Sequence, residues 1–339
     1  MVDLHSQYQH IKDKVDQQIQ NVLDSTAFIN GPEVQFFKNE LETYLDVKHV
    51  IPCGNGTDAL QVAMMALDLK PGDEVITTTF TFVATAEVIA LLGLTPVLVD
   101  VDLDTFLIST EAIENAITEK TKAIVPVHLF GQNADMIKIL EIADKHNLYV
   151  IEDAAQSIGS EFIFTDGSRK KSGTMGDFGC TSFFPSKNLG CYGDGGAIFT
   201  NDDKLAEKAT MIVNHGMKVR YYHDEIGVNS RLDSIQAAVL RVKLPELDNY
   251  NSARRKAADY YDAAFQNEEK IITPKRVENS NHVFHQYTLK LKDIDRSAMQ
   301  EYLKKQGIPA MVYYPVPLHR QKAYRYENVK NQSFEVADQ

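Results

Sequence analysis

Short apolar runs rich in Val and Ile alternate with amphipathic stretches through the first two thirds of this 339-residue chain. Buried strands of a parallel sheet form nearly continuous apolar runs, and each parallel connection needs a crossover helix. The alternation therefore predicts an α/β layer protein with a mainly parallel sheet. The strands are expected at 49–51, 74–79, 96–101, 122–127, 148–151, 180–184 and 196–200, and the helices at 57–67, 83–92 and 135–146.

The pattern changes at both ends of the chain. The stretch up to residue 24 is typical of an amphipathic helix that lies outside the sheet. Residues 232–265 are helical and charged, and Pro245 is expected to break or kink this helix. A strand at 287–291 and a helix at 296–306 are expected beyond it. We therefore divide the chain into a helical arm (1–24), a large domain (25–245) and a smaller α+β domain (246–339).

Composition excludes several classes of protein. The chain is 44% hydrophobic and 24% charged, which excludes a disordered protein. Its net charge of −12 makes nonspecific electrostatic binding to nucleic acid or to an anionic membrane unfavourable. Its three cysteines are too few for a disulfide framework or a Cys-x-x-Cys zinc site, so we expect no metal and a reducing compartment. No signal peptide and no 18-residue apolar run is present, which predicts a cytoplasmic protein without membrane contact.

A glycine turn at residues 54–59 (Gly-Asn-Gly-Thr-Asp-Ala) links a predicted strand to a predicted helix. It fits the loose dinucleotide fingerprint, but Asp73 and Glu74 precede their strand, whereas the ribose-binding acid of a nicotinamide site follows it. Free N–H groups at the start of the helix, with the Thr57 hydroxyl, would bind a phosphate. The alternative is a tight turn that Thr57 or Asp58 caps.

Two further segments carry side chains suited to chemistry. Glu152 and Asp153 end an apolar strand and point to opposite faces, so a buried carboxylate there needs a cationic or hydrogen-bonding partner such as a protonated pyridine nitrogen. The alternative for Asp153 is a helix N-cap. Lys187 lies between an apolar strand and a glycine-rich loop, where desolvation favours a nucleophilic amine. The alternative is an ordinary exposed loop lysine.

With these segments the whole chain resembles the DegT/DnrJ/EryC1/StrS family of pyridoxal-phosphate sugar aminotransferases. The most specific segments are 152–156 (Glu-Asp-Ala-Ala-Gln) and 182–187 (Ser-Phe-Phe-Pro-Ser-Lys), which is followed by Asn-Leu-Gly-Cys-Tyr-Gly-Asp-Gly-Gly. The lysine segment is most similar to aminotransferases that act on UDP-linked 3-keto sugars. The resemblance implies the aspartate aminotransferase-like fold (fold type I) with a seven-stranded sheet, and an end of the small domain that is incomplete. The other matching segments are 2–4, 31–34, 55–60, 71–76, 81–85, 127–132, 215–216 and 227–233.

The resemblance also assigns roles to individual residues. Lys187 would bind the cofactor covalently and shuttle a proton, and Asp153 would pair with the pyridinium nitrogen. Phe82 would stack on the ring and Gln156 would lie near its 3-hydroxyl; the alternatives are a core aromatic and a surface amide. The phosphate would contact Gly56, Thr57, Ser182 and, from a second subunit of a homodimer, Asn229. Arg231 would clamp a carboxylate, or else form a surface ion pair, and the further substrate residues are Tyr313, Tyr314, His319, His215, Lys218 and Arg220.

The implied reaction is a ping-pong transamination with pyridoxal 5′-phosphate (PLP), which becomes pyridoxamine 5′-phosphate (PMP) during turnover. L-glutamate would leave as 2-oxoglutarate, and the amino group would pass to a nucleotide-linked keto sugar, most simply a UDP-linked 3-keto sugar for O-antigen or other surface polysaccharide. A 4-keto sugar on dTDP or UDP is the alternative. Relatives that dehydrate sugars carry histidine at the lysine position, which Lys187 disfavours. A non-catalytic sensor and an NAD-dependent oxidoreductase are the rivals from other classes.

Overall fold

A seven-stranded sheet runs through the centre of the computed structural model, which describes residues 2–324 and 333–339. Its strand order is β1-β9-β8-β5-β4-β2-β3. Only β9 runs antiparallel to its neighbours, so the predicted seven-stranded, mainly parallel sheet is confirmed. The strands are β1 (His49–Cys53), β2 (Glu74–Thr78), β3 (Thr95–Val99), β4 (Thr121–Val125), β5 (Tyr149–Asp153), β8 (Phe178–Ser182) and β9 (Gly196–Thr200).

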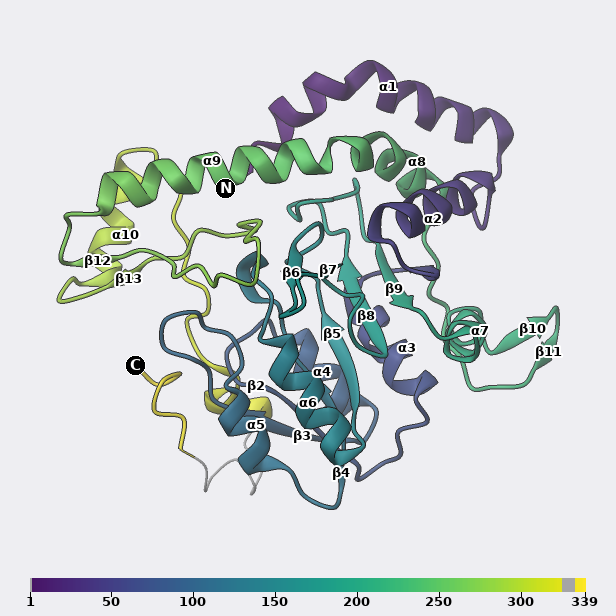
Figure 1. Cartoon of the computed structure of the whole chain (residues 1–339). Helices are drawn as coiled ribbons and strands as arrows, with labels where there is room; N and C mark the ends of the chain where they lie inside the picture. The colour runs from purple at the N-terminus through teal and green to yellow at the C-terminus, as the bar shows by residue number, and fades with distance from the viewer. Residues whose placement is uncertain (1, 325–332) are drawn as a thin grey trace.

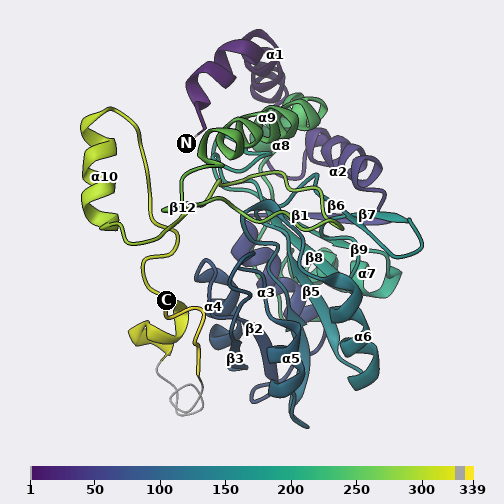
Figure 2. The same cartoon turned by 60° about the vertical axis from the view of Figure 1, so that its left-hand side comes forward.

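Helices cover both faces of the sheet and make three layers (Figures 1 and 2). On one face α3, α4 and α7 pack over apolar side chains that include Ile51, Ile151 and Ile198. On the other face α5 and α6 cover the β2–β5 part, and α2 with α8 cover the β1–β9–β8 part. These helices are α2 (Pro32–Leu45), α3 (Gly56–Ala66), α4 (Ala84–Leu91), α5 (Thr110–Ala116), α6 (Met136–His146), α7 (Asp203–Ile212) and α8 (Ser234–Lys243).

The strand order excludes a dinucleotide-binding sheet. In that fold the strand before the glycine turn lies beside the second strand. Here β1 is an edge strand beside β9, and β2 lies near the opposite edge. Glu74 begins β2 and its carboxylate accepts a hydrogen bond from the Thr118 hydroxyl, at the amino end of the sheet. The NAD alternative is therefore wrong for this chain.

The C-terminal third is organised around one long helical unit. In this unit α8 passes through a 3-10 turn (Leu244–Glu246) into α9 (Leu247–Phe265), so Pro245 interrupts the helix only locally (Figure 1). The predicted N-terminal helix is α1 (Leu4–Ser25), which lies outside the sheet and packs on α8. Of the strand expected at 287–291 only β13 (Lys290–Leu291) forms, paired with β12 (Ile271–Ile272); the helix α10 (Arg296–Lys305) follows.

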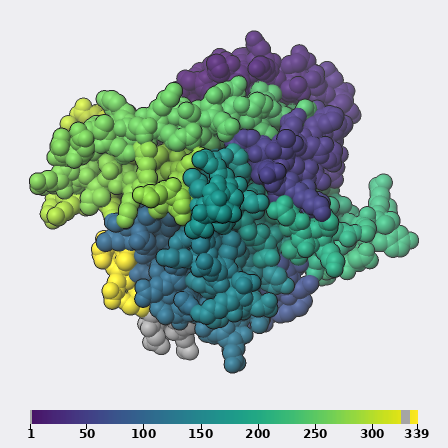
Figure 3. All heavy atoms as spheres, viewed as in Figure 1, coloured from purple at the N-terminus to yellow at the C-terminus, as the bar shows by residue number. Residues whose placement is uncertain are grey.

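Two short hairpins complete the described fold. One, β6 (Glu161–Ile163) with β7 (Arg169–Lys171), follows β5. The other, β10 (Met217–Val219) with β11 (Tyr222–His223), projects from the body of the chain (Figure 3). No helix in the described part of the chain is long and apolar enough to cross a membrane. Residues 2–324 and 333–339 also contain no cluster of three or more His, Cys, Asp or Glu side chains arranged to bind a metal.

Candidate active site

The ends of three strands bring the predicted segments to one edge of the sheet. Because β5 and β8 are parallel, Asp153 and Ser182 end their strands at the same edge. Since β9 is antiparallel to both β8 and β1, the end of β1 at Cys53 also lies there. Open α/β sheets bind their ligands at this carboxyl edge. The glycine turn, the acidic segment and the loop that carries Lys187 therefore start from one place.

Asp153 is buried, with 7% of its surface exposed, and keeps acceptor capacity on both oxygens. The Thr85 hydroxyl donates a 2.8 Å hydrogen bond to Oδ2, and the backbone N–H of Ala155 donates to Oδ1 at 3.1 Å. No described lysine, arginine or histidine forms an ion pair with this carboxylate. No regular helix follows, so the N-cap alternative is wrong and a buried anion remains free to pair with a ligand cation.

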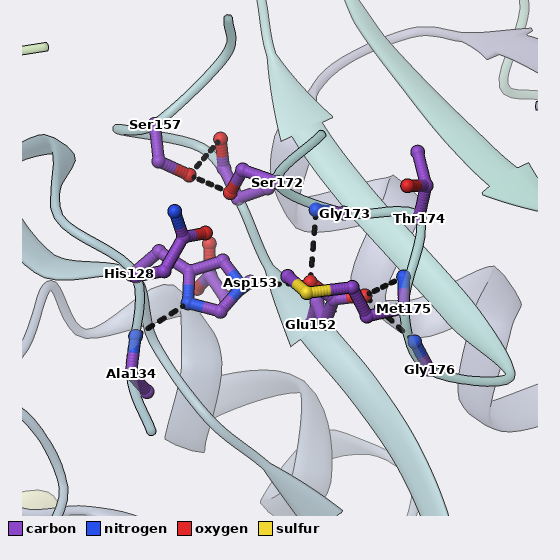
Figure 4. Close-up of polar contacts among 12 residues, drawn as sticks. His128, Ala134, Glu152, Asp153, Ser157, Ser172, Gly173, Thr174, Met175 and Gly176 are labelled. Carbon is purple, nitrogen blue, oxygen red and sulfur yellow. Dashed lines mark hydrogen bonds and ion pairs between the residues drawn. The ribbon is translucent and has the colours of Figure 1, made fainter. Parts of the chain in front are cut away.

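Glu152 points to the other face of β5, as strand alternation predicts, and has a different role (Figure 4). It is fully buried, and three backbone N–H groups of residues 173–176 donate to it at 2.6–2.9 Å. His128 Nε2 lies 2.8 Å from its Oε2, and because the Ala134 N–H donates to Nδ1, the histidine proton faces the carboxylate. Glu152 thus fixes the loop that leads into β8, and leaves the ligand side of β5 to Asp153.

Gln156 lies in the turn after Asp153 and joins the same site. Its Oε1 accepts the N–H of Phe130 at 2.8 Å, and its Nε2 donates to the Tyr314 hydroxyl at 3.0 Å. The side chain is buried, so the surface-amide alternative is wrong. Burial and the nearby Asp153 charge raise the pKa of Tyr314 well above its usual value. Tyr314 therefore remains a neutral hydroxyl between Gln156 and the aromatic side chains around it.

The start of α3 forms the expected cradle of free donors. The helix begins at Gly56, one residue earlier than predicted, and Asn55 rather than Thr57 or Asp58 is its cap, since Asn55 Oδ1 accepts the N–H of Asp58 at 2.8 Å. The N–H groups of Gly56 and Thr57 have no acceptor within the helix. A Cβ on Gly56 would lie 2.7 Å from the Cβ of Ser182, so glycine permits this close approach.

Lys187 lies in the loop after β8, and its side chain is half-buried. Burial lowers the pKa of its amine from 10.5 to about 8, although the charge of Asp153 acts in the opposite direction. In the described part of the chain no carboxylate forms an ion pair with Lys187. The amine is consequently more easily deprotonated than that of an exposed loop lysine, and this alternative does not fit the observed burial.

Three other predicted residues have side chains available to a ligand. Phe82, just before α4, is 56% exposed, so it is not the core aromatic of the alternative interpretation. Asn229 is exposed, beside Ser230, whose hydroxyl accepts the Gly54 N–H at 2.9 Å and donates to Asp58. Arg231 is half-buried and forms no ion pair within the described residues, which disfavours the surface ion pair.

The remaining predicted substrate residues form two groups. His319 is buried with both ring nitrogens engaged, at 2.7 Å from the Thr79 hydroxyl and 2.8 Å from Asp338, while the Tyr313 hydroxyl donates to Met311 Sδ. The second group belongs to the projecting β10–β11 hairpin and the turn before it, and so lies away from the Asp153 group of the same chain (Figures 1 and 3). Its members are His215, Lys218 and Arg220.

Sequence reasoning missed residues that act on the site only through long-range contacts. Thr85 binds Asp153 from 68 positions away, and His128 binds Glu152 from 24 positions away. No local sequence pattern around Thr85 or His128 indicates which acid it binds. The one available signal was the burial expected of both acids, which required partners somewhere in the fold.

The comparisons with known proteins agree with this site. Residues 9–339 match the DegT/DnrJ/EryC1/StrS aminotransferase family, and the chain belongs to that family. The pleiotropic regulatory protein of Geobacillus stearothermophilus is 49% identical, covering 96% of this chain and 86% of that protein. The UDP-2-acetamido-2-deoxy-3-oxo-D-glucuronate aminotransferase of Pseudomonas aeruginosa is 48% identical over 97% and 89%. The dTDP-3-amino-3,4,6-trideoxy-alpha-D-glucose transaminase of Streptomyces venezuelae is 37% identical over 96% and 84%.

Solved structures agree as well. A DegT/DnrJ/EryC1/StrS aminotransferase from Brucella abortus superposes with a TM-score of 0.91 at 41% identity, covering 96% of this chain and 87% of that one. The Bacillus subtilis protein NtdA, solved with bound cofactor PMP, gives a TM-score of 0.86 at 34% identity over 97% and 75%. This chain accordingly has the PLP-dependent transferase fold and is a PLP-dependent aminotransferase.

The residues present fit PLP. Asp153 is a buried carboxylate without a cationic partner among the described residues, and the first turn of α3 has N–H groups free for a phosphate. Phe82 presents an exposed ring, and Lys187 an amine of lowered pKa. When bound, PLP supplies an electron-accepting ring that stabilises negative charge on a substrate carbon. The protein supplies the orientation, the charges and the proton transfers.

Proposed function

We propose that this chain transfers the amino group of L-glutamate to a nucleotide-linked keto sugar, with a UDP-linked 3-keto sugar as the preferred acceptor. The observation that carries the proposal is Lys187, an amine of lowered pKa on the sheet edge that also carries Asp153. The 48% identity to an aminotransferase of a UDP-linked 3-oxo sugar supports the acceptor. The dTDP-sugar relative, at 37%, makes dTDP-linked sugars the second class to test.

In this proposal Lys187 holds the cofactor and moves a proton at its Nζ. Burial lowers the pKa of the amine to about 8, so a useful fraction is neutral near neutral pH and can act as nucleophile and base. Asp153 keeps the ring nitrogen of the cofactor protonated, and Thr85 orients that carboxylate through its hydroxyl. Gln156, held by Phe130 and Tyr314, is placed to donate its second amide hydrogen to the ring substituents.

The phosphate end lies at α3 in the same proposal. Gly56 and Thr57 offer backbone N–H groups at the positive end of the helix dipole, and Ser182 adds a hydroxyl beside Gly56. Asn229 and the β10–β11 hairpin are exposed, so we assign them to the active site of a second copy in a homodimer. Arg231 binds a substrate carboxylate, since guanidinium binds carboxylates through two hydrogen bonds.

The test is transamination by the purified chain. The protein, loaded with PLP, is incubated with L-glutamate and either a UDP-linked 3-keto sugar, a UDP-linked 4-keto sugar or their dTDP counterparts. We expect one 2-oxoglutarate for each amino sugar, fastest with the UDP-linked 3-keto acceptor and absent in Lys187→Ala. Amination of no acceptor, with PLP bound at another lysine or not at all, would contradict the proposal and favour a sensor. We assign the activity to cytoplasmic synthesis of surface polysaccharide precursors.

A further inference from the structure

The loop that carries Lys187 is closed tightly at its base. The backbone N–H of Lys187 donates to the Phe184 carbonyl at 2.8 Å, and that of Cys191 donates to the Phe183 carbonyl at 2.8 Å. A Cβ on Gly190 would lie 2.3 Å from the Pro185 carbonyl oxygen, so only glycine fits this turn. These contacts fix the base of the loop, and contacts from other elements hold its outer part.

Asn251 of α9 holds the loop beside Lys187. The Asn188 side chain is buried, and its Nδ2 donates to Asn251 Oδ1 at 2.7 Å and to the Val283 carbonyl at 3.0 Å. Asn251 is 1% exposed, and its own Nδ2 donates to the Ile158 carbonyl at 3.2 Å. Ile158 belongs to the turn that follows Asp153. A single buried amide thus connects the segment of Lys187 to the segment of Asp153.

The close contact with this turn requires a glycine. Gly159 has a φ of +83°, and a Cβ there would lie 2.6 Å from Asn251 Nδ2. A buried amide group that lacks a hydrogen-bond partner is destabilising. The glycine and the amide together make the bridge specific, because neither a larger residue at 159 nor an apolar side chain at 251 would preserve it.

Lys243, at the end of α8, contacts the same loop at Gly190, which is three residues after Lys187. Its Nζ donates to the Gly190 carbonyl at 2.5 Å and lies 4.8 Å from the ring of Tyr192. The side chain is 1% exposed and forms no ion pair with a described carboxylate. Burial of an ammonium without a counter-charge is costly, and a methionine would fill the same space without that cost. The ammonium is explained by its hydrogen bond to the loop.

Both residues come from one rigid element, since α8 and α9 form a continuous unit and positions 243 and 251 are about two helical turns apart. We propose that Asn251 and Lys243 are positioning residues for Lys187, and that the α8–α9 unit thereby sets the place and the solvent exposure of its amine. This inference rests on the proposed role of Lys187. It also means that α9, on the C-terminal side of the proposed domain boundary, takes part in the active site.

The readout is the reactivity of the Lys187 amine toward PLP. The apoprotein is mixed with PLP at a series of pH values, reduced with borohydride, and digested, and mass spectrometry measures the labelled Lys187 peptide. The wild-type rate is expected to rise with pH around a midpoint near 8, because only the neutral amine attacks. In Asn251→Ala and Lys243→Met the loosened loop admits water to the amine. We expect the midpoint to rise by about one pH unit and the rate at pH 8 to fall roughly fivefold, because the neutral fraction of the amine at pH 8 falls by that factor.

Two variants serve as matched controls. Asn249→Ala removes an exposed asparagine of the same helix, whose side chain binds Glu246 and no other side chain in the described part of the protein. Arg241→Met breaks two ion pairs between α8 and α2 without touching the loop, and thus controls for a general loss of stability. We expect both to keep the wild-type midpoint. Unfolding by urea is measured for all variants, so that a change in reactivity is separated from a change in stability.

Unchanged midpoints in Asn251→Ala and Lys243→Met, or shifts no larger than that of Arg241→Met, would overturn the proposal. If Asn251→Ala does not fold, Asn251→Ser, which retains a polar group at this buried position, is measured in the same way. Failure of the proposed function looks different: the wild-type Lys187 peptide would then carry no label at any pH. The two ideas are therefore separable in one experiment.

Discussion

The Thr85 hydroxyl donates a 2.8 Å hydrogen bond to Oδ2 of Asp153, which joins the first turn of α4 to the end of β5. The exposed ring of Phe82 lies three residues before Thr85. The hydrogen bond consequently fixes the backbone segment that carries Phe82 relative to the buried carboxylate. A flat ligand with a cationic nitrogen would contact both, and this relationship leads to the first prediction.

Asp153→Asn should reduce the rate of amino transfer by roughly 10²–10³-fold, the usual effect of removing one preorganised electrostatic group from an active site. The amide keeps the shape and the Thr85 contact but cannot hold a ring nitrogen protonated. Single-turnover rates with L-glutamate measure the effect, with PLP saturating. A variant within threefold of the wild-type rate would show that Asp153 does not pair with the cofactor.

Glu152→Gln should change stability far more than chemistry. The carboxylate accepts hydrogen bonds from three backbone N–H groups, and an amide would present its own N–H₂ to at least one of them. We expect the free energy of unfolding to fall by about 1–3 kcal/mol. Urea denaturation measures this free energy. Asp153→Asn is the matched control, because it replaces the carboxylate on the other face of β5 by an amide. Equal stability of Glu152→Gln and wild type would contradict the role given to Glu152.

Gly56→Ala should weaken PLP binding more than tenfold. The new Cβ would lie 2.7 Å from the Cβ of Ser182, so the first turn of α3 must shift away from the phosphate, at a cost of about 1–3 kcal/mol. The double variant Gly56→Ala/Ser182→Gly removes the 2.7 Å contact but leaves one of 3.3 Å to the Cα of residue 182, so it should recover part of the lost stability without the Ser182 hydroxyl. Fluorescence titration gives the PLP affinity. Normal affinity of Gly56→Ala would place the phosphate elsewhere.

Phe82→Ala should leave the free energy of unfolding within about 0.5 kcal/mol of wild type, because the ring is 56% exposed. Loss of one stacking contact worth about 1 kcal/mol should weaken PLP binding roughly fivefold. Phe37→Ala is the contrasting variant, since this fully buried ring should cost about 3–5 kcal/mol of stability. An unchanged PLP affinity in Phe82→Ala would remove Phe82 from the cofactor site.

Lys187→Met should make the apoprotein more stable than wild type at pH 7. The folded-state pKa of Lys187 is lowered by burial to about 8, below the ordinary 10.5 of the unfolded chain, so the unfolded state binds more protons between these values. The penalty of the buried charge is complete below pH 8 and is relieved as the pH rises toward 10.5. Urea unfolding at pH 7 and pH 10 should show the advantage of the variant shrinking. A constant difference would mean that the amine is not desolvated.

The sequence predicted those features that local patterns determine. Strand β9 has the expected bounds, and the sheet edge was placed correctly because Glu152 and Asp153 end an apolar strand. The sequence predicts a strand over 287–291, which is longer than the observed β13. Only Lys290 and Leu291 pair, because β12 offers only two residues as partners. Asn55 was missed as the cap of α3 because the glycine at 56 made the later residues look like the helix start.

Contacts between distant segments could not be predicted in this way. Nothing local to Lys243 distinguishes it from a surface lysine of a charged helix, and its burial is decided by where the Gly190 loop packs. Asn251 is likewise one of several polar residues on α9. For His319, the family resemblance implies a substrate residue, while the structure shows hydrogen bonds at both ring nitrogens. Its role in binding substrate stays a prediction.

The central claim is tested most directly by the visible absorbance of the PLP-loaded protein before and after L-glutamate is added. We predict a visible band that depends on Lys187, that disappears on addition of L-glutamate with release of one 2-oxoglutarate per site, and that is absent from Lys187→Ala. A protein that binds PLP with no Lys187-dependent band, or whose band L-glutamate leaves unchanged, would contradict the account.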